Sequence, residues 1–397
     1  MMSRVWAGID SGKTHHHCVV LDADGAKLLS RRVANDEPEL LQLLADVLGL
    51  ADDATWAVDM ADGGAALLIA LLVNHDQELL YIPGRAVNRA ADGYRGEGKT
   101  DARDALVIAD QARVRRDLKP IRPSDEITAE LKLFTARRTD LACDRNRSIN
   151  RLRATLTSMF PALERALDLT TKGPLVLLTG YQTPLAIRRV GLTRLTKWLS
   201  VRNVRNAESL ATAAVRAAER QHTAVPGEAA IASLVGALVE EVMALNEKIA
   251  DVDKLIEGRF RRHELAEVIT SMPGIGSLLG AEFLAAVGSD MASFATPDRL
   301  AAFAGLAPAP HDSGKSHGNL HRPQQYHRGL QRVFYTSALI SIRSDPNSRR
   351  FYDRKRAEGK RHIQAVLALA RRRVNVFWAL IRDRRCYQVI PPVTHAA

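Results

Sequence analysis

Four aspartates carry the chemistry that this sequence suggests first: Asp10, Asp59, Asp101 and Asp104. Asp10 and Asp59 each close a short apolar run, which is typical of the end of a buried strand. Asp101 and Asp104 open a helical pattern, and their i,i+3 spacing places them on one face of that helix. Carboxylate oxygens are ligands that suit Mg²⁺ or Mn²⁺, and paired divalent ions promote displacement at phosphorus. The four residues therefore predict a metal-dependent centre for phosphoryl transfer.

A separate structural role for each acid is the alternative. Asp10 also suits a turn before Gly12, and Asp59 also suits the cap of a following helix. Asp101 and Asp104 suit the first turn of a helix, where carboxylates stabilise free N–H groups. The metal interpretation requires all four side chains to meet at one edge of a sheet, whereas four separate structural roles require no such meeting.

The first part of the chain, residues 1–125, alternates strand and helix patterns, which predicts an α/β domain. The segment Asp22-Ala23-Asp24-Gly25 between two strand patterns is typical of a β-hairpin. A β-α-β-α order follows, so Asp10 and Asp59 are expected to end neighbouring strands. The predicted strands are residues 5–9, 15–21, 26–33, 55–58 and 78–82, and the predicted helices are 37–48, 62–72 and 101–116.

The middle of the chain, residues 126–262, is nearly all helix pattern. Helices are predicted over 129–167 and 210–221, with an interruption by the prolines between 174 and 184. From Leu234 to Ile256, apolar residues recur at spacings of four and three, which approximates a heptad seam. Two interpretations stay open: a helix packed on its own domain, or a coiled-coil helix whose partner comes from this chain or another subunit.

The last part, residues 263–397, begins with a helix pattern, the turn Pro273-Gly274-Ile275-Gly276, and a second helix pattern over 277–287. Such a helix-hairpin-helix-like element presents backbone N–H groups at a helix N-terminus, where a phosphate can sit. The same turn would serve equally as a packing corner without a ligand. Further amphipathic helices are predicted over 326–342 and 361–381.

A polar segment over residues 311–325 contains a candidate nucleophile, Ser313. A serine needs a base or a metal to activate it, and the four aspartates could supply that metal if two domains or two subunits converge. Four basic or polar residues would then lie near the developing phosphate charge: Lys315, His317, His321 and Arg322. A turn serine is the simpler explanation, and Ser316 competes for the catalytic role.

Composition favours a polyanionic partner. The 397 residues, enough for two or three domains, include 56 Lys and Arg against 45 Asp and Glu, for a net charge of +11. The basic excess is clustered, notably over 145–153, 349–360 and 371–373, which strengthens the case for nucleic acid. The candidate nucleic-acid contacts are Lys99, Arg103, Gly274, Gly276, Lys315, His317 and Arg322.

Other residue types exclude alternative classes of site. The three cysteines are far apart and show neither metal spacing nor a disulfide framework, which fits a reducing cytoplasm. His15, His16 and His17 alternate faces in a strand, so they predict a solvated strand and no metal site. The longest apolar stretch, residues 63–73, is too short to span a bilayer, and no signal peptide is expected at the start.

These motifs together resemble a known family. Gly8-Ile9-Asp10, then Asp59, then the segment from Lys99 to Ala105 resemble the RuvC-like domain of DEDD-type insertion-sequence transposases. Three later motifs are similar to the C-terminal transposase domain of that family, and they follow in family order: Met272-Pro273-Gly274-Ile275-Gly276, Phe303-Ala304-Gly305-Leu306-Ala307-Pro308 and Asp312-Ser313-Gly314. One departure is the second acid, which is usually Glu in the family. Here it is Asp59, one methylene shorter, and the nearby Asp62 competes for the position.

The resemblance implies an RNase H-like (RuvC-like) α/β domain, a helical and coiled-coil middle, and a helical C-terminal transposase domain. It implies a recombinase that excises and inserts its own mobile element, guided by a structured noncoding bridge RNA. Asp10, Asp59, Asp101 and Asp104 would bind Mg²⁺ or Mn²⁺, and Ser313 would form a covalent phosphoserine with DNA. A homo-oligomer, dimer or tetramer, is implied, acting in a bacterial cytoplasm in association with the nucleoid.

Two rivals use the same residues differently. A RuvC-like, structure-selective DNA nuclease such as a junction resolvase would use the acids with water as the nucleophile, so that Ser313 would be dispensable. A nucleic-acid-binding protein without catalytic activity would use the acids only to stabilise helices and turns, so that Asp10 and Asp104 would matter only for stability.

Overall fold

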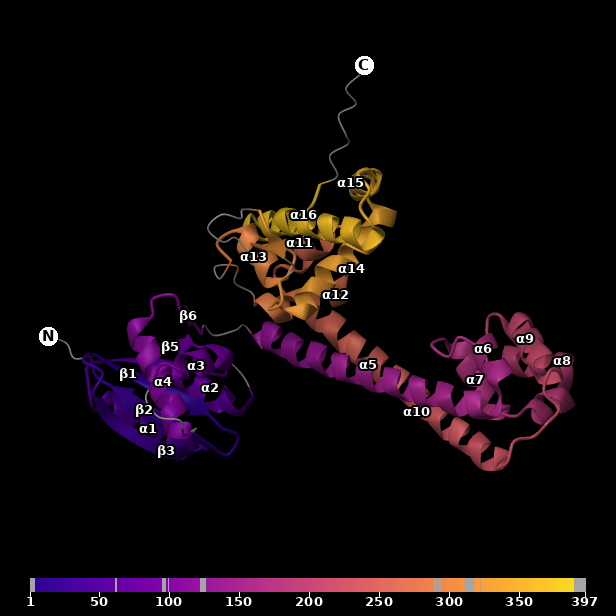
Figure 1. The fold of residues 1–397 in the computed structure, drawn as a ribbon, viewed down its shortest axis with the longest axis horizontal. Coiled ribbons are helices and arrows are strands. Elements are labelled where there is room, and N and C mark those ends of the chain that lie inside the picture. The colour runs from indigo at the N-terminus through magenta and orange to yellow at the C-terminus, as the bar shows by residue number, and fades with distance from the viewer. Residues whose placement is uncertain are drawn as a thin grey trace, which may run out of the picture. The chain divides into compact units, whose positions relative to one another are not determined.

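The computed structural model describes residues 4–60, 63–94, 98, 100–121, 126–288, 291, 294–310, 318–321 and 323–388. The chain divides into two compact units, Met1–Ser124 (unit 1) and Asp125–Ala397 (unit 2) (Figure 1). Unit 1 is mixed α/β, whereas the elements of unit 2 are almost entirely helices. The predicted α/β start and helical remainder are therefore confirmed.

Unit 1 is built on a mixed sheet, which has six strands within the described residues, in the order β3-β2-β1-β4-β5-β6. The first three strands form an antiparallel meander, and β1, β4 and β5 run parallel. The predicted hairpin at residues 22–25 joins β2 to β3. The strands are β1 (Arg4–Ser11), β2 (His15–Leu21), β3 (Lys27–Ala34), β4 (Asp53–Val58), β5 (Glu78–Tyr81) and β6 (Lys119–Pro120).

Helices cover both faces of this sheet because its central strands are apolar on both sides. Alternate residues of β1 such as Ile9 pack in one core with α1 (Glu37–Leu48) and α2 (Ala66–Asn74). The opposite face packs against α3 (Gly84–Ala91) and α4 (Asp101–Val114). The sequence did not predict α3 or β6. The helix predicted from residue 62 begins as a 3₁₀ turn, Gly63–Ala65, before α2.

In unit 2, two long helices of the same chain, α5 (Glu126–Met159) and α10 (Glu228–Phe260), pack side by side (Figure 1). They are antiparallel, because an ion pair of 2.9 Å joins Glu130 to Arg259 and a hydrogen bond of 2.8 Å joins Ser148 to Glu241. The heptad-like seam of α10 therefore has a partner helix within its own chain.

The predicted seam is out of register at the start of α10. Leu234 is 58% exposed, and the neighbouring Val235 and Val239 are buried instead. These two valines belong to a core that α10 shares with α7 (Lys172–Gly180) as well as with α5. The local helical bundle therefore determines which face of α10 is buried at this end, and the heptad pattern holds only from Val242 onward.

The segment that connects α5 to α10 in the sequence forms a helical bundle. Its helices are α6 (Pro161–Ala166), α7, α8 (Pro184–Val201) and α9 (Ala207–Glu219). The predicted interruption at residues 174–184 is wrong up to residue 180, because Pro174 lies in the first turn of α7, where a missing N–H costs no hydrogen bond. It is confirmed at residues 181–183, between α7 and α8. Pro184 likewise begins α8, after Thr183, whose hydroxyl accepts from the backbone N–H of Ala186 at 3.2 Å. The helix predicted over 129–167 ends at Met159, before Pro161.

The C-terminal part of unit 2 packs around three phenylalanines. Phe283, Phe334 and Phe377 meet edge to face, with ring centroids 4.7–6.2 Å apart. The helices predicted over 326–342 and 361–381 are present as α14 (Arg328–Ser344) and α16 (His362–Arg382), whereas α15 (Pro346–Ala357) was not predicted. The elements are α11 (Ala266–Ser271), α12 (Ser277–Val287), α13 (Pro297–Phe303), β7 (Ala309–Pro310), β8 (Leu320–His321), α14 (Arg328–Ser344), α15 (Pro346–Ala357) and α16 (His362–Arg382).

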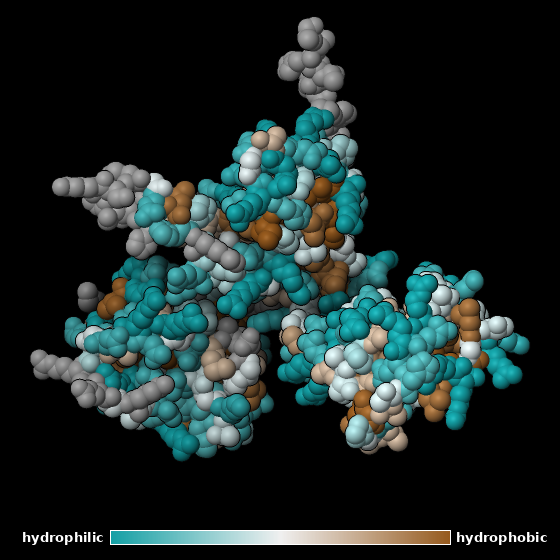
Figure 2. Space-filling model, turned by 45° about the vertical axis from the view of Figure 1, so that its right-hand side comes forward, coloured by the Kyte–Doolittle hydropathy of each residue, from teal (hydrophilic) through white to brown (hydrophobic). Residues whose placement is uncertain are grey.

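The face of the molecule drawn in Figure 2 is mostly polar. On the face drawn in Figure 2, hydrophilic residues predominate and apolar residues are interspersed among them. Single exposed apolar side chains, such as Leu133 at 71% and Ile363 at 61%, are ordinary features of protein surfaces. Within the described part of the chain, no helix combines the length and apolar character needed to cross a membrane.

Candidate functional site

Two adjacent parallel strands place Asp10 beside Asp59. Ile9 of β1 lies opposite Val58 of β4, so the residues that follow them come next to each other at the same edge of the sheet. The Asp59 carboxylate accepts a hydrogen bond of 3.1 Å from the backbone N–H of Ser11. This bond fixes the second acid against the end of the first acid's strand. The structure thus brings the first two acids together, as the strand pattern predicts.

Helix α4 brings the other two acids to the same strand. A Cβ atom on Gly8 would lie 2.4 Å from the carbonyl oxygen of Ala105 and 2.2 Å from the backbone nitrogen of Ala109, so α4 lies directly on β1. Side chains alternate along a strand, so Asp10 lies on the same face of the sheet as Gly8, the face that α4 covers. Asp101 and Asp104 occupy the first turn of α4, immediately before Ala105.

The electrostatics of Asp59 connect it to α4. Burial raises the pKa of the Asp59 carboxyl group above its ordinary value, and the negative charge of Asp104 raises it further. The hydrogen bond from the Ser11 N–H acts in the opposite direction, because it favours the charged form. Asp59 and Asp104 are therefore close enough for like charges to repel.

Asp10 and Asp101, the other two acids, both lie near His17. His17 on β2 lies opposite Asp10 in the antiparallel pair with β1. Burial lowers the pKa of the His17 imidazole, and the negative charge of Asp101 partly offsets that effect. Asp10, by its strand register, and Asp101, by its charge, both neighbour this one histidine. We call the group Asp10, Asp59, Asp101 and Asp104 the acid edge.

Helix capping does not explain why the aspartates of the acid edge stand at these positions. The N-cap of α4 is Thr100, whose hydroxyl accepts from the backbone N–H of Arg103 at 3.2 Å. Asp101 and Asp104 lie in the first turn, where the helix dipole favours carboxylates but does not require two of them. The N-cap of α2 is Ala65, so Asp59 does not cap the helix that follows it.

The donor chemistry of the acid edge fits a divalent metal ion. Its side chains offer only carboxylate oxygens, which suit Mg²⁺ or Mn²⁺. Within the described ranges, no three acidic, His or Cys side chains lie close enough to ligate one ion. Carboxylates repel one another, and a divalent cation offsets that repulsion. Binding therefore requires the four side chains to draw together at the edge where the backbone places them.

Arg103, a predicted nucleic-acid contact, makes structural hydrogen bonds. Its guanidinium donates to the carbonyl oxygens of Gly98 at 2.8 Å, Tyr94 at 3.1 Å and Ala91 at 3.2 Å. These bonds tie the connection between α3 and α4 to the start of α4, and so help to position Asp101 and Asp104. No pattern in the sequence indicates this role. Asp62, Lys99, Ser313, Lys315, His317 and Arg322 lie outside the described residues.

The helix-turn-helix element is present as α11, the turn and α12, but its two glycines differ. Gly274 has φ of +80°, and a Cβ atom there would lie 2.5 Å from the carbonyl oxygen of Ser337 in α14. Gly274 is therefore required for packing. Gly276 is exposed, and a Cβ atom there would meet nothing within 4 Å. It is the N-cap of α12 and has no side chain that could cover the helix N-terminus.

The histidine prediction needs a correction. His15 is exposed, but His16 is only 1% exposed, on the face of β2 opposite to α4. Burial lowers the pKa of the His16 imidazole, and the Asp59 charge partly offsets this effect. The strand is therefore not solvated along its length, because helices cover both faces of the sheet. The alternation of faces along the strand, which argued against a shared metal ion, holds.

Comparisons with known proteins place the acid edge within a matched region. A model of the DEDD-type IS110 transposase domain, described as a transposase, matches residues 7–161. A second model, described as a transposase of the IS116/IS110/IS902 family, matches residues 266–353. The first match contains all four acids, and the second contains the α11–α12 turn and Ser313.

Similar proteins match along the whole chain. A 42 kDa protein of insertion element IS900 from Mycobacterium paratuberculosis is 56% identical over 100% of both chains. A 44.8 kDa protein of insertion element IS116 from Streptomyces clavuligerus is 50% identical over 99% of this chain and 98% of its own. A mini-circle putative transposase for IS117 from Streptomyces coelicolor is 28% identical over 93% of this chain and 91% of its own.

Proposed function

We propose that this chain, which belongs to the IS110/IS116 family of transposases, excises and inserts a mobile DNA element by metal-assisted phosphoryl transfer with Ser313 as the nucleophile. The family establishes a DNA transposase, an enzyme of recombination, and its DEDD-type domain implies dependence on a divalent metal ion. The observation that supports the proposal most is that two strand ends and the first turn of α4 place Asp10, Asp59, Asp101 and Asp104 at one edge of the sheet. The strand order β3-β2-β1-β4-β5 supports an RNase H-like assignment for unit 1.

The acid edge is the proposed holder of Mg²⁺ or Mn²⁺. A divalent ion bound there would supply positive charge to a DNA phosphate that is being cleaved. The chain's own contribution is positioning. The Ser11 N–H holds Asp59, the close contact at Gly8 sets α4 on β1, and Arg103 secures the segment that leads into α4.

Ser313 is the proposed nucleophile. Its Oγ would form a new bond to the DNA phosphorus, while the bond from that phosphorus to one deoxyribose oxygen breaks. The serine proton is given up and the departing sugar oxygen gains one, so charge and bonds balance. A hydroxyl of another DNA strand would reverse the reaction, rejoin the DNA and release the serine. The match of the C-terminal family model to residues 266–353, which contain Ser313, supports this assignment.

The variant Ser313→Ala tests the nucleophile. We expect it to lose both the covalent protein–DNA adduct on denaturing gels and the recombined product. Ser316→Ala, a hydroxyl removed three residues away, is the matched control and should retain both. If only Ser316→Ala loses the covalent adduct and the recombined product, Ser316 is the nucleophile. Undiminished DNA nicking by Ser313→Ala would support the rival structure-selective nuclease that uses water.

Oligomer assembly is tested with complementary inactive chains. We propose that the acid edge of one subunit works with Ser313 of another in a homo-oligomer. Mixing Asp10→Asn with Ser313→Ala should then restore part of the recombination activity, because some mixed sites receive both intact groups. If the mixture stays inactive although the two chains co-assemble, the two groups act within one subunit.

A structured noncoding RNA is the proposed guide, on the strength of the family resemblance. The experiment is purification of the chain from cells that carry the mobile element, followed by sequencing of the bound RNA. We expect one structured transcript from the element to be enriched. Recombination by protein that is free of RNA, at unchanged rate and site choice, would contradict a guide role.

A further inference from the structure

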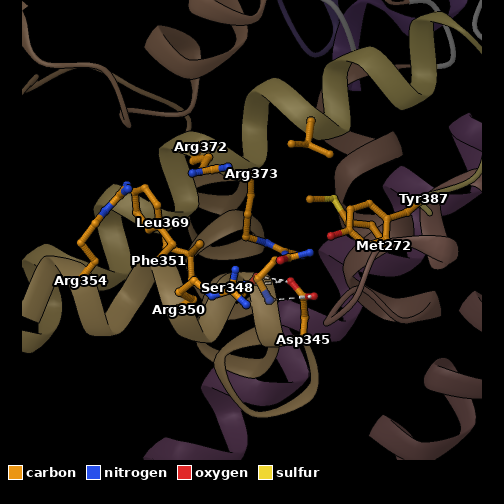
Figure 3. A pocket seen from close by; sticks show the side chains of 12 residues that line it. Met272, Asp345, Ser348, Arg350, Phe351, Arg354, Leu369, Arg372, Arg373 and Tyr387 are labelled. Carbon is orange, nitrogen blue, oxygen red and sulfur yellow. Dashed lines mark hydrogen bonds between the residues drawn. The ribbon is translucent and has the colours of Figure 1, made fainter. Parts of the chain in front are cut away.

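Unit 2 contains a cavity of about 440 Å³ that is separate from the acid edge (Figure 3). Its volume falls in the range of about 300–1,000 Å³ that is usual for ligand pockets. Helices α15 and α16 supply most of its lining, and Met272 and Tyr387 close one side. The charged side chains of the lining and the aromatic ring between them are Asp345, Arg350, Phe351, Arg354, Arg372 and Arg373.

The lining is strongly basic because it has four arginines and one acid. That acid, Asp345, is 4% exposed and already engaged. It caps α15 by accepting from the backbone N–H of Ser348 at 3.0 Å and from the Ser348 hydroxyl at 2.6 Å. These two bonds hold the Asp345 carboxylate at the head of α15, where its negative charge acts on Arg373.

Arg373 is a fixed cation in the wall of the cavity. It is 4% exposed, and it donates to the Ser337 hydroxyl at 2.7 Å and to the Pro273 carbonyl. Burial lowers the pKa of its guanidinium to about 10, which leaves it charged at neutral pH. Its bond to Pro273 connects the cavity with the turn between α11 and α12. Figure 3 shows Arg373 reaching from α16 toward Ser348 and Asp345 at the head of α15.

Phe351 holds two further arginines without neutralising them. The guanidinium carbons of Arg354 and Arg372 lie 5.0 and 5.1 Å from the centroid of its ring. Such contacts orient a cation and leave its charge available to an anion. Among the described residues, no carboxylate lies within ion-pair distance of Arg350 or Arg372. Arg354 is 3.8 Å from Glu358, at the limit of an ion pair.

We propose that this arginine cavity binds a backbone phosphate of the DNA on which the transposase acts. Guanidinium groups suit the proposal because each can donate two hydrogen bonds to the oxygens of one phosphate. The contact would hold DNA in register without reading its sequence. The proposal deepens the proposed function, because it assumes that DNA is the substrate. DNA is favoured over a free phosphate ion because basic residues 349–360 and 371–373 continue beyond the cavity along both helices.

The test compares two double variants of the full chain. Arg350→Gln with Arg372→Gln removes two charges that line the cavity. Arg349→Gln with Arg371→Gln removes two charges from neighbouring positions on the same helices. The control arginines are not among the lining residues and instead pair with Asp353 and Asp298. Arg373 stays unchanged because its bonds to Ser337 and Pro273 are structural. Thermal unfolding verifies that both variants fold.

The measurement is the affinity for a labelled DNA duplex as a function of salt concentration. We expect the cavity variant to lower the slope of log K against log salt by about one unit for each phosphate that is no longer bound. The affinity loss should be the same for unrelated DNA sequences, and the control slope should change less. Equal slopes for the two double variants would overturn the proposal, since the arginines would then act only through overall charge.

Three further arms separate the remaining outcomes. A larger loss of binding to RNA than to DNA would overturn the DNA assignment. Stabilisation of the wild-type chain by inorganic phosphate, without any change in the DNA salt slope, would also overturn it and indicate a free-phosphate site. Asp10→Asn is measured in parallel for cleavage. If Asp10→Asn loses cleavage and the cavity variant binds DNA like the control, the cavity proposal fails while the proposed function stands.

Discussion

The acid edge and the arginine cavity collect charge of one sign by different means. At the acid edge the backbone does the positioning: two strand ends and a helix start bring short carboxylates together. In the arginine cavity the side chains do it, because long guanidinium groups from two helices are held by Phe351 and Ser337. In the first arrangement the backbone fixes where each short side chain starts, so only small side-chain movements are needed to bring the carboxylates together. The second depends on the rotamers of long, flexible side chains.

This difference suits the two proposed tasks. Chemistry at phosphorus requires groups held within about 0.5 Å of a productive position, which strands and helices provide better than flexible side chains do. Holding a DNA backbone tolerates looser geometry, because phosphate contacts are largely electrostatic. Changes at the acid edge should therefore affect catalysis or folding sharply, and changes in the arginine cavity should affect affinity gradually.

The largest expected effect is at the acid edge itself. Asp10→Asn or Asp104→Asn should lower DNA cleavage more than about 100-fold, because loss of a metal-orienting group alone costs about that much. Binding of DNA should stay close to wild type, since both variants keep every basic side chain. Gel assays of cleavage, with binding measured by fluorescence anisotropy, check both expectations. Normal cleavage in both variants would favour the non-catalytic nucleic-acid-binding alternative.

The next effect tests the backbone positioning of the acid edge. Gly8→Ala should destabilise unit 1 by about 3 kcal/mol, because its Cβ atom would overlap the backbone of α4. Gly84→Ala, at the start of α3, is the control, because a Cβ atom there meets nothing within 4 Å. Denaturant unfolding measures both. Equal stability of the two variants would mean that α4 does not lie on β1 at Gly8.

A matched pair of glycines extends the comparison to unit 2. Gly274→Ala should lower stability by about 1–3 kcal/mol, because its φ is positive and its Cβ atom would overlap the Ser337 carbonyl. Gly276→Ala should fold like wild type, so any loss of DNA affinity in it reports on the α12 N-terminus. Chemical denaturation and DNA titration separate the two effects. Equal destabilisation by both substitutions would contradict the assigned packing.

The smallest effect is a dependence of stability on pH. The pKa of Asp59 is raised in the folded chain above its ordinary value of 3.8, so the folded state binds this proton more tightly. The stability that the proton contributes is present at low pH and is lost as pH rises through the folded-state pKa. Without divalent metal, Asp59→Asn should therefore unfold at a higher temperature than wild type at pH 8.

The same pair of proteins supplies the control for that prediction. Asn keeps the oxygen that accepts from the Ser11 N–H, so the substitution changes mainly the charge. The difference in unfolding temperature should shrink as pH falls through the raised folded-state pKa of Asp59, because the wild-type carboxyl group then also becomes neutral. Addition of Mn²⁺ should stabilise the wild-type chain more than the variant. A difference that is constant from pH 4 to pH 8 would show that charge is not its cause.

The contrast also explains what the sequence could predict. Asp10 and Asp59 follow apolar runs and Asp101 begins a helix pattern, so backbone rules were enough to predict that two strand ends and a helix start lie at one edge of the sheet. That the four side chains share a metal ion stays a prediction. The arginine cavity was not predictable in this way, because most of its residues come from two helices, α15 and α16. The sequence of one helix does not show how it packs against another. The basic clusters were visible, but not the cavity that they line.

Missed helices have similar local causes. Helix α15 is rich in Arg and lacks an apolar stripe, so periodicity does not mark it. Its start was nevertheless signalled by Asp345 before Pro346, an N-cap followed by proline at the first helical position. Helix α7 contains Pro174, which predicts an interruption when it is considered alone, although proline is compatible with the first turn of a helix.

The most direct test of the central claim is Mn²⁺ binding by the full chain, measured by electron paramagnetic resonance. Wild-type protein should bind Mn²⁺ at a site that Mg²⁺ competes for, and the double variant Asp10→Asn, Asp104→Asn should lose it while remaining folded. If the folded double variant binds Mn²⁺ as tightly as the wild-type chain, the acid edge is not the metal site and the proposed chemistry has no centre.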